Sequence, residues 1–409
     1  MKLHSKLVTG FVSMALGAAL LTGCSSGGKD DALEVFSNKS ENTETYKALI
    51  KKFEEENPDI DIKLNAPPEA ETVLKSRLTK NDLPDVMAIG GNATYGELAR
   101  AGVLMDLSDS EMINKIQPAY LDMINRLAGE EKEGTYGIPY ATNANAVIYN
   151  KDKFEELGVE VPKTWDEFVA ILDKAKAEGE IPLYLTLKDA WTGMIPWNSL
   201  AANIQPEEFA KKVNNGEASF QEDYPEVADK MLTLLEYGHQ DNMGVAYGDG
   251  NTAFAKGEGV MYLQGNWAIP EIKKANPDIN LGVFAMPVTN TPEENKLVSG
   301  VDVLFAVNSD TEYSEEAKKF IEFMINEQNA KQYIDEQAAF SAVEGVFQED
   351  PVMEGIKVNF QEGSITSFPD HYYPAGMQAE NLIQDFLINK NKDEFLKKMD
   401  EEWEKVQNR

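Results

Sequence analysis

Apolar residues along the chain follow two repeating patterns, one typical of strands and one typical of helices. Short apolar runs or alternating segments predict strands, and apolar residues three and four positions apart predict helices. The first elements predicted in this way are a strand at 32–36, a helix with Tyr46, Leu49, Ile50 and Phe53 on one face, a strand at 60–64, a helix near 69–79 and a strand at 86–89. This β-α-β-α-β order favours a mainly parallel sheet covered by helices.

The second part of the chain repeats this alternation. Thr164 and Glu167 have the spacing of a capping box at the start of a helix. Tryptophans occur in segment 188–197, which Gly193 and Pro196 predict to be a loop. The other predicted elements are helices at 226–238, 314–326 and the C-terminus, and strands at 181–185, 260–263, 281–286 and 303–307. Two α/β sets within 409 residues predict two domains.

Residues 134–150 connect the two sets. Glycine and proline at the start of this segment disfavour a helix, and the apolar run 146–149 predicts a strand. We expect the chain to pass here from one lobe to the other along the floor of a cleft. The polar side chains of this crossing can then hydrogen-bond a polar ligand, although an ordinary loop-to-strand connection gives the same pattern; they are Tyr140, Thr142, Asn143 and Asn145.

Two further polar residues lie at strand ends. Asn92 follows the strand at 86–89, and loops after such strands are where open α/β sheets bind ligands. Asp302 directly precedes the strand at 303–307, and a buried carboxylate there needs hydrogen-bonding partners such as sugar hydroxyls. A loop-stabilising role for Asn92 and a capping role for Asp302 are the plainer alternatives.

Aromatic side chains gather in two irregular segments. Trp191 lies in the predicted loop and is either part of a small core or a flat stacking surface on a pocket wall. Segment 363–374 contains Phe368, Asp370 and His371 close to prolines. This density of ring faces and hydrogen-bonding groups makes the segment a candidate binding loop.

Acidic residues greatly outnumber basic ones. The chain has 70 Asp and Glu against 38 Lys and Arg, and its formal net charge is −32. Such a surface repels nucleic acid and anionic lipid headgroups, so we expect no polyanionic partner. The hydrophobic fraction of 42% is that of an ordinary globular protein.

Cysteine and histidine are scarce, which limits metal and disulfide chemistry. Cys24 is the only cysteine, so neither an intrachain disulfide nor a thiolate metal cluster can form. Only His239 and His371 lie outside the N-terminal segment, which excludes a His-rich zinc site. We therefore expect no metal and no cofactor, and a zinc site built from carboxylates is the alternative that the composition leaves open, although no motif points to one. A glycosidase-type carboxylate pair stays open as an alternative, because 70 acidic residues place such pairs by chance.

The N-terminal segment has the features of an export signal. A basic start is followed by an apolar stretch at 7–21, which is too short to span a membrane comfortably. The stretch ends in Leu-Thr-Gly-Cys, which resembles the bacterial lipoprotein signal, and a plain secretory signal is the alternative. The resemblance implies a signal peptide at 1–23, lipidation of Cys24, a flexible tether at 24–31 and an extracytoplasmic protein held at the outer face of the cell membrane.

Several segments in their order along the chain resemble one family. With the lipoprotein signal and segment 134–150, the sequences TWDEF, GEGVMYLQGNW and KKFIEFMIN are similar to the sugar-binding branch of the family-1 extracellular solute-binding proteins of ABC importers. The resemblance extends from Ala32 to the C-terminus and is nearest to lipoproteins for raffinose- and isomaltose-type α-1,6-linked oligosaccharides. It implies a monomeric non-enzyme that carries a neutral oligosaccharide to an ABC permease. A secreted carbohydrate hydrolase, or a same-fold protein for a peptide or polyamine, is the alternative.

The resemblance also implies an architecture and a site. The fold class is α/β, with two type II periplasmic-binding-protein-like lobes, 32–142 plus 270–308 and 143–269 plus 309–409, joined by hinge strands around a ligand cleft. By analogy with the family, the terminal sugar is held by Lys39, Asn92, Asp302, Phe368, Asp370 and His371. Trp191 and Trp267 are the implied stacking faces, and Tyr140 and Asn143 complete the predicted ligand-binding set.

Overall fold

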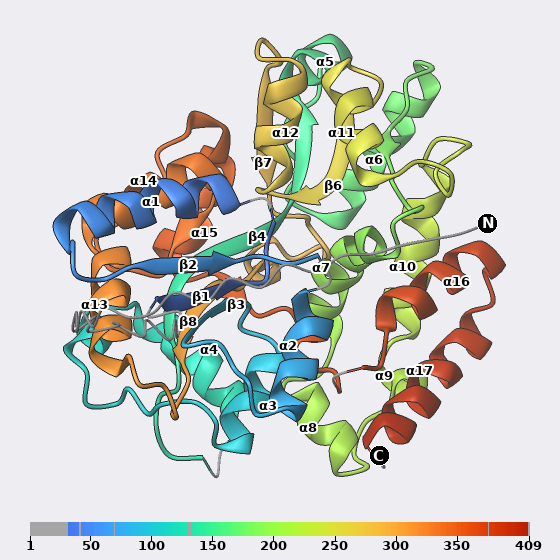
Figure 1. Cartoon of the computed structure of the whole chain (residues 1–409). Coiled ribbons are helices and arrows are strands. Elements are labelled where there is room, and N and C mark those ends of the chain that lie inside the picture. The colour runs from blue at the N-terminus through green and yellow to red at the C-terminus, as the bar shows by residue number, and fades with distance from the viewer. Residues whose placement is uncertain (1–31, 41, 69, 130–131, 375, 408–409) are drawn as a thin grey trace, which may run out of the picture.

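The computed structural model describes residues 32–40, 42–68, 70–129, 132–374 and 376–407. The predicted signal peptide, the tether and Cys24 lie outside this range. In the described part of the chain, no helix combines the length and the apolar character needed to cross a membrane. The described chain folds into two α/β lobes joined by long strands (Figure 1).

The first lobe is built on the sheet predicted from the N-terminal pattern. Strands β1 (Leu33–Ser37), β2 (Ile62–Asn65) and β3 (Val86–Ile89) are parallel, in the order β2-β1-β3. The helix with the predicted apolar face is α1, which buries Tyr46, Leu49, Ile50 and Phe53. The helices that precede the first crossing are α1 (Thr43–Glu56), α2 (Ala70–Thr79), α3 (Ala93–Ala101) and α4 (Pro118–Ala128), with the 3-10 turn η1 (Glu111–Lys115).

Two long antiparallel strands, β4 (Ile138–Asn150) and β8 (Leu297–Val307), cross between the lobes. The first half of β4 pairs with β8 and with β9 (Phe340–Ser341), and its second half pairs with β6 (Met261–Gly265) and β7 (Leu281–Phe284). At its other edge β8 pairs with β3 and with β10 (Ile365–Thr366). The chain therefore passes from one lobe to the other along β4, as the sequence predicts for this segment (Figure 1).

Helices surround the second-lobe strands, which include β5 (Leu183–Tyr184) beside β6. The predicted capping box is confirmed, because the Thr164 hydroxyl and the Glu167 carboxylate each accept a hydrogen bond from the other residue's backbone N–H at the start of α6. The helices are α5 (Lys151–Leu157), α6 (Trp165–Ala177), α7 (Met194–Ile204), α8 (Phe209–Asn214), α9 (Phe220–Asp223), α10 (Pro225–Glu236), α11 (Tyr247–Ala255), α12 (Ala268–Ala275), α15 (Glu354–Glu362), α16 (Ala379–Asn389) and α17 (Lys392–Gln407). Short 3-10 turns are η2 (Ala190–Gly193), η3 (Pro292–Glu294), η4 (Pro351–Met353) and η5 (Pro369–Tyr372).

The hydrophobic cores divide the chain differently from the predicted lobe boundaries. Helices α13 (Ser314–Met324) and α14 (Glu327–Gln337) belong to the first-lobe core, although 309–409 was predicted in the second lobe. The cause is aromatic packing on α1, where Phe53 lies 5.4 and 5.3 Å from the rings of Phe320 and Phe323. Conversely, β7 and the start of β8 pack with the second-lobe strands, although 270–308 was predicted in the first lobe.

Two local predictions are also corrected. The predicted loop 188–197 is instead η2 followed directly by α7. Pro196 is compatible with that helix because it occupies the first turn, where backbone N–H groups have no intrahelical partner. Strand β8 begins at Leu297, so Asp302 lies within the strand rather than before it.

Candidate functional site

Two adjoining cavities lie in the cleft between the lobes. We call the cavity next to the crossing strands the hinge compartment; it has a volume of about 400 Å³. The second, of about 730 Å³, is the outer compartment, which lies between α2 and α3 on one side and residues 373–374 and 376–380 on the other. Nine of the ten predicted ligand-binding residues line the hinge compartment: Lys39, Asn92, Asn143, Trp191, Trp267, Asp302, Phe368, Asp370 and His371.

A hydrogen-bonded group at the hinge is centred on Asp302. Its Oδ1 accepts hydrogen bonds from Lys39 Nζ at 2.6 Å and from Asn143 Nδ2 at 2.7 Å. The Lys39 and Asp302 side chains keep exposed fractions of 24% and 15%, so each still reaches the compartment. The Oδ1 atom of Asn143 is buried and has no hydrogen-bond partner among the described residues. Lys39, from the turn after β1, thus joins Asn143 of β4 and Asp302 of β8 in one polar group, in which Asn143 Oδ1 is an unused acceptor.

Asn92 has a structural role in addition to its place on the cavity wall. Its Oδ1 accepts hydrogen bonds from the backbone N–H groups of Thr94 and Tyr95, which caps the N-terminus of α3. The cap fixes the side chain at the rim where β3 ends. The plainer interpretation of Asn92 from sequence is therefore correct, and the residue also lines both compartments.

Two tryptophans from the second lobe form part of the hinge compartment. The Trp267 ring folds over Gly265, where a Cβ atom would approach Trp267 Cζ3 to 2.0 Å, so only glycine allows this ring position. Trp191 lies in η2 with 39% of its surface exposed, and its ring contacts Tyr247 edge to face at 5.0 Å. Exposed ring surface beside polar groups suits a ligand with an apolar face.

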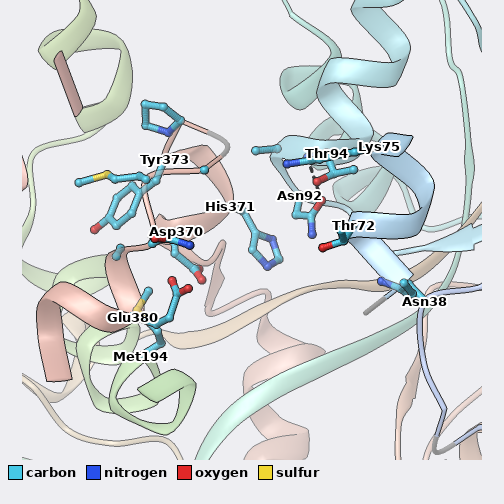
Figure 2. Close-up of a pocket in the computed structure, with 17 residues that line it drawn as sticks. Asn38, Thr72, Lys75, Asn92, Thr94, Met194, Asp370, His371, Tyr373 and Glu380 are labelled. Atoms are coloured by element: carbon cyan, nitrogen blue, oxygen red, sulfur yellow. Dashed lines mark hydrogen bonds between the residues drawn. The ribbon is translucent and has the colours of Figure 1, made fainter. Parts of the chain in front are cut away.

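Phe368 and His371 form a stacked pair, with ring centroids 4.8 Å apart and planes inclined by 29°. Gly300 of β8 allows the pair to approach the hinge strand, since a Cβ at this position would lie 2.7 Å from Phe368 Cδ2 and 3.4 Å from His371 Cε1. Figure 2 shows the His371 imidazole projecting between the two walls of the outer compartment.

Asp370 carries a carboxylate oxygen, Oδ1, that is buried without a hydrogen-bond partner among the described residues. Its backbone N–H donates to Asn198 Oδ1 at 3.3 Å, which attaches η5 to α7. Burial raises the pKa of the Asp370 carboxyl above its usual value, and the neighbouring His371 and Asn198 oppose this effect in part. A buried oxygen that lines a cavity and lacks a partner is a natural acceptor for a ligand hydroxyl.

Comparison with known proteins identifies the family of this chain. Residues 38–331 match the family model of the bacterial extracellular solute-binding proteins. The chain belongs to this family. The "Multiple sugar-binding protein" of Streptococcus mutans is 30% identical over 392 residues, covering 91% of each chain. The "Melibiose/raffinose/stachyose-binding protein MelE" of Bacillus subtilis is 24% identical over 340 residues, covering 79% of this chain and 77% of that protein.

Solved structures agree with this assignment. The structure titled "SBP RafE in complex with raffinose" has a TM-score of 0.77 and 27% identity to this chain, and the match covers 92% of this chain and 99% of the other. The two-lobed fold of periplasmic sugar-binding proteins predicted from sequence is thereby confirmed. Members of this solute-binding family are the substrate-binding proteins of transporters rather than enzymes.

One predicted ligand contact of this solute-binding protein is corrected by the structure. Tyr140 is 1% exposed and lies in the core of the first lobe, where its ring is 5.0 Å from Phe305 and 4.8 Å from Tyr333. It lines neither compartment. The register of β4 against β8 shifts on both sides of Ala141, and Tyr140 faces the core while Asn143, beyond the shifts, faces the cleft.

Eight other residues line the hinge compartment and were not in the predicted ligand-binding set: Asn38, Gly90, Asn145, Met194, Ile195, Asn198, Val301 and Glu380. Asn145 shares a strand face with Asn143, so strand alternation counted from Asn143 identifies it as a second cleft residue. Asn38 is adjacent to Lys39 at the end of β1. Glu380 carries no distinguishing sequence pattern among so many acidic residues.

Neither compartment provides a metal site. Within the described ranges, no group of three or more His, Cys, Asp or Glu side chains is arranged to hold a metal ion. The site instead offers ring faces, amide groups and a shared carboxylate. Such an arrangement suits reversible binding of a neutral polar molecule that also has apolar faces.

Proposed function

We propose that this chain binds a neutral oligosaccharide, α-1,6-linked and of the raffinose or isomaltose type, in the hinge compartment and delivers it to an ABC permease. The observation that carries the proposal is that the exposed Trp191 and the half-buried Trp267 line one cavity together with the Lys39–Asp302–Asn143 group. Sugar rings have apolar C–H faces and a rim of hydroxyl groups, so they match both features. Raffinose-type ligands in the names of the relatives support the choice of sugar.

In the proposed binding mode, aromatic rings stack on the sugar faces and polar groups hydrogen-bond the sugar hydroxyls. Trp267, Trp191 and Phe368 cover sugar faces, and each such contact contributes about 0.5–1.5 kcal/mol beyond the burial of area. Asp302 and Asp370 accept hydroxyl hydrogen bonds, and bonds to ionised groups contribute about 1.5–3 kcal/mol each. Because the Asp370 oxygen has no partner to lose, its bond to a sugar hydroxyl carries little competing cost.

Lobe closure follows from the same geometry. The walls of the cleft come from both lobes, so a ligand touches both at once only in the closed arrangement and favours it. Hinge closure of this kind is general among periplasmic binding proteins. The closed form then docks on the permease, which accepts the sugar unchanged. Lipidation of Cys24, with 24–31 as tether, holds the monomeric protein at the outer face of the membrane in this proposal.

Calorimetry with a panel of ligands tests the proposal. Raffinose and isomaltotriose are expected to bind, whereas maltotriose, a peptide and a polyamine are expected to bind far more weakly. A preference for the peptide or the polyamine would overturn the sugar assignment. Binding to none of the sugars would do the same.

The hydrolase alternative needs a separate measurement. The purified protein is incubated with each oligosaccharide, and the products are separated by chromatography. The proposal requires intact sugar after prolonged incubation. Release of shorter sugars at an enzyme-like rate would identify a hydrolase instead.

A further inference from the structure

Strand β4 changes its pairing partner at one edge where it passes between the lobes. On the edge that faces away from β8, it pairs with β9 at Ala141 and Thr142 and with β6 from Asn145 onwards. Ala144 lies between these two pairings and is fully buried. A buried backbone N–H without a hydrogen-bond partner is costly, so another group has to satisfy Ala144 at this point.

The side chain of Asn266 supplies that partner. Its Oδ1 accepts a hydrogen bond from the Ala144 N–H at 2.7 Å, and the Asn266 backbone N–H donates to the Ala144 carbonyl at 3.2 Å. The Nδ2 of the same side chain donates to the carbonyl of Ala338 at 2.7 Å. Asn266 is 1% exposed, so water does not compete for these bonds.

The bonds of this amide join chain segments from different lobes. Asn266 belongs to the second lobe, where it lies between β6 and α12. Ala338 directly follows α14, whose buried residues belong to the first-lobe core. Its φ of 49° is in the left-handed region, which a residue other than glycine keeps only where its surroundings hold it. The Asn266 amide therefore connects the second lobe to the crossing strand and to the end of α14.

Residues next to these bonds line the hinge compartment. Trp267 directly follows Asn266, and Asn143 directly precedes Ala144. Asn143 in turn donates to Asp302 at 2.7 Å. Each bond of the amide thus acts on the backbone beside a side chain that we expect to touch the ligand.

We infer that Asn266 is a positioning residue of the binding site, which fixes the Trp267 ring relative to the Lys39–Asp302–Asn143 group. Asn266 itself lines neither compartment, so it acts through its neighbours. The inference rests on the proposed sugar-binding function and adds to it a residue outside the ligand-contacting set.

Alanine substitution tests this role. Asn266→Ala removes both side-chain bonds and is expected to weaken sugar binding about tenfold in protein that is still folded. Asn329→Ala is the matched control. Asn329 is 3% exposed, its amide donates to Phe323 O and accepts from Lys52 Nζ, each at 2.7 Å, and it lines neither compartment.

Thermal melting and calorimetry together separate positioning from stability. Both variants lose buried hydrogen bonds and should melt at a lower temperature than wild type. Calorimetry is carried out well below the lower melting temperature, where only Asn266→Ala should lose affinity. An affinity of Asn266→Ala within twofold of wild type would show that the residue only stabilises the fold, and it would overturn the inference.

Asn266→Asp gives a measurement that is specific to the bond with Ala338. An ionised aspartate keeps an acceptor for the Ala144 N–H but has no proton for the Ala338 carbonyl, whereas a protonated one has both. Burial favours the neutral form of a carboxyl, so the proton is regained at mildly acidic pH. The ratio of the variant to the wild-type dissociation constant should therefore fall from about tenfold at pH 9 to within about threefold at pH 5.

The ratio isolates the substituted side chain from the rest of the site. Both of its partners are backbone groups, which do not titrate in this range, and division by the wild-type value removes the titration of Asp370 and His371. A ratio that does not change with pH would contradict the role of the bond to Ala338.

Amide hydrogen exchange at Ala144 supplies a readout that needs no sugar. Exchange should be faster in Asn266→Ala than in wild type and unchanged in Asn329→Ala, because only the first variant removes the acceptor of this N–H. If exchange responds in this way but wild type binds no sugar, the proposed function fails while the bond at the hinge stands. If wild type binds sugar and Asn266→Ala binds it equally well, the function stands and the inference fails.

Discussion

The two walls of the hinge compartment differ in whether their ligand-facing groups already have hydrogen-bonding partners within the protein. The first-lobe wall consists of polar side chains that already have partners: Lys39 and Asp302 bond to each other, and Asn92 caps α3. The second-lobe wall consists of ring side chains and a carboxylate oxygen without a partner: Trp191 is exposed, Trp267 and His371 are half-buried, Phe368 is buried, and the oxygen belongs to Asp370. We expect the second-lobe wall to provide most of the affinity, because the groups of the first-lobe wall must share bonds that they already make.

The comparison is tested most strongly by removing a ring from the second-lobe wall. Trp267→Ala takes away the stacking surface over Gly265, and we expect sugar affinity to fall about a hundredfold. Isothermal titration calorimetry measures the change. Trp165→Ala on α6 is the control: this tryptophan packs on Phe168 and under Lys230, away from the cleft, so sugar affinity is expected to stay the same. A loss below threefold in Trp267→Ala would contradict the role of the rings.

A smaller loss is expected from the first-lobe wall. Asp302→Asn keeps the shape of the side chain but removes the charge that Lys39 and Asn143 share. We expect affinity to fall about ten- to thirtyfold, the range of one charge-assisted hydrogen bond. The exposed Asp310, in the turn after β8, gives the matched control Asp310→Asn, which should bind as wild type does. A loss larger than that of Trp267→Ala would reverse the ranking of the two walls.

Asp370→Asn separates binding from stability on the second-lobe wall. Burial raises the pKa of this carboxyl above 3.8, so the folded state keeps the proton to a higher pH than the unfolded chain does. Stability is therefore lost as the pH rises through the raised pKa. At pH 7 the variant should melt at a higher temperature than wild type while binding sugar about tenfold more weakly.

Thermal melting between pH 3 and pH 8 checks the sign of this effect. The melting temperatures of wild type and Asp370→Asn should converge at the acidic end, where the native carboxyl is also neutral. The variant Asp385→Asn, at an exposed position on α16, should follow wild type at every pH. A lower melting temperature of Asp370→Asn at pH 7 would mean that the carboxylate stabilises the fold, which contradicts the account of its burial.

The sequence predicts the local elements of this protein well because their patterns are local. The helix α1 face, the capping box at Thr164 and the order β1-α1-β2-α2-β3 all depend on neighbouring residues. The assignment of α13 and α14 to the second lobe was wrong. Their position depends on the contact of Phe53 with Phe320, which lies 267 positions further along the chain, and no local sequence pattern records such a contact.

Site residues show the same limit. Asn143 and Asn145 lie on one face of β4, as alternation predicts. The register shifts beside Tyr140 interrupt this alternation, so the pattern alone does not place Tyr140. The pairing of Asp302 with Lys39 joins β8 to the end of β1, and it is visible only in three dimensions. Within a regular stretch of strand, local periodicity therefore identifies which face a residue occupies, but not which distant residue it meets there.

The smallest expected effect comes from Gly300, where the crossing strand β8 meets the Phe368–His371 pair. A Cβ at this position would lie 2.7 Å from Phe368 Cδ2, so Gly300→Ala must shift the stacked rings. We expect sugar affinity to fall about three- to tenfold because the stacking surface moves without being lost. Calorimetry compares this variant with Gly248→Ala on α11, where a Cβ meets nothing within 4 Å. Unchanged affinity in Gly300→Ala would mean that the position of the Phe368 ring does not control binding, and the second-lobe wall would then reduce to its tryptophans.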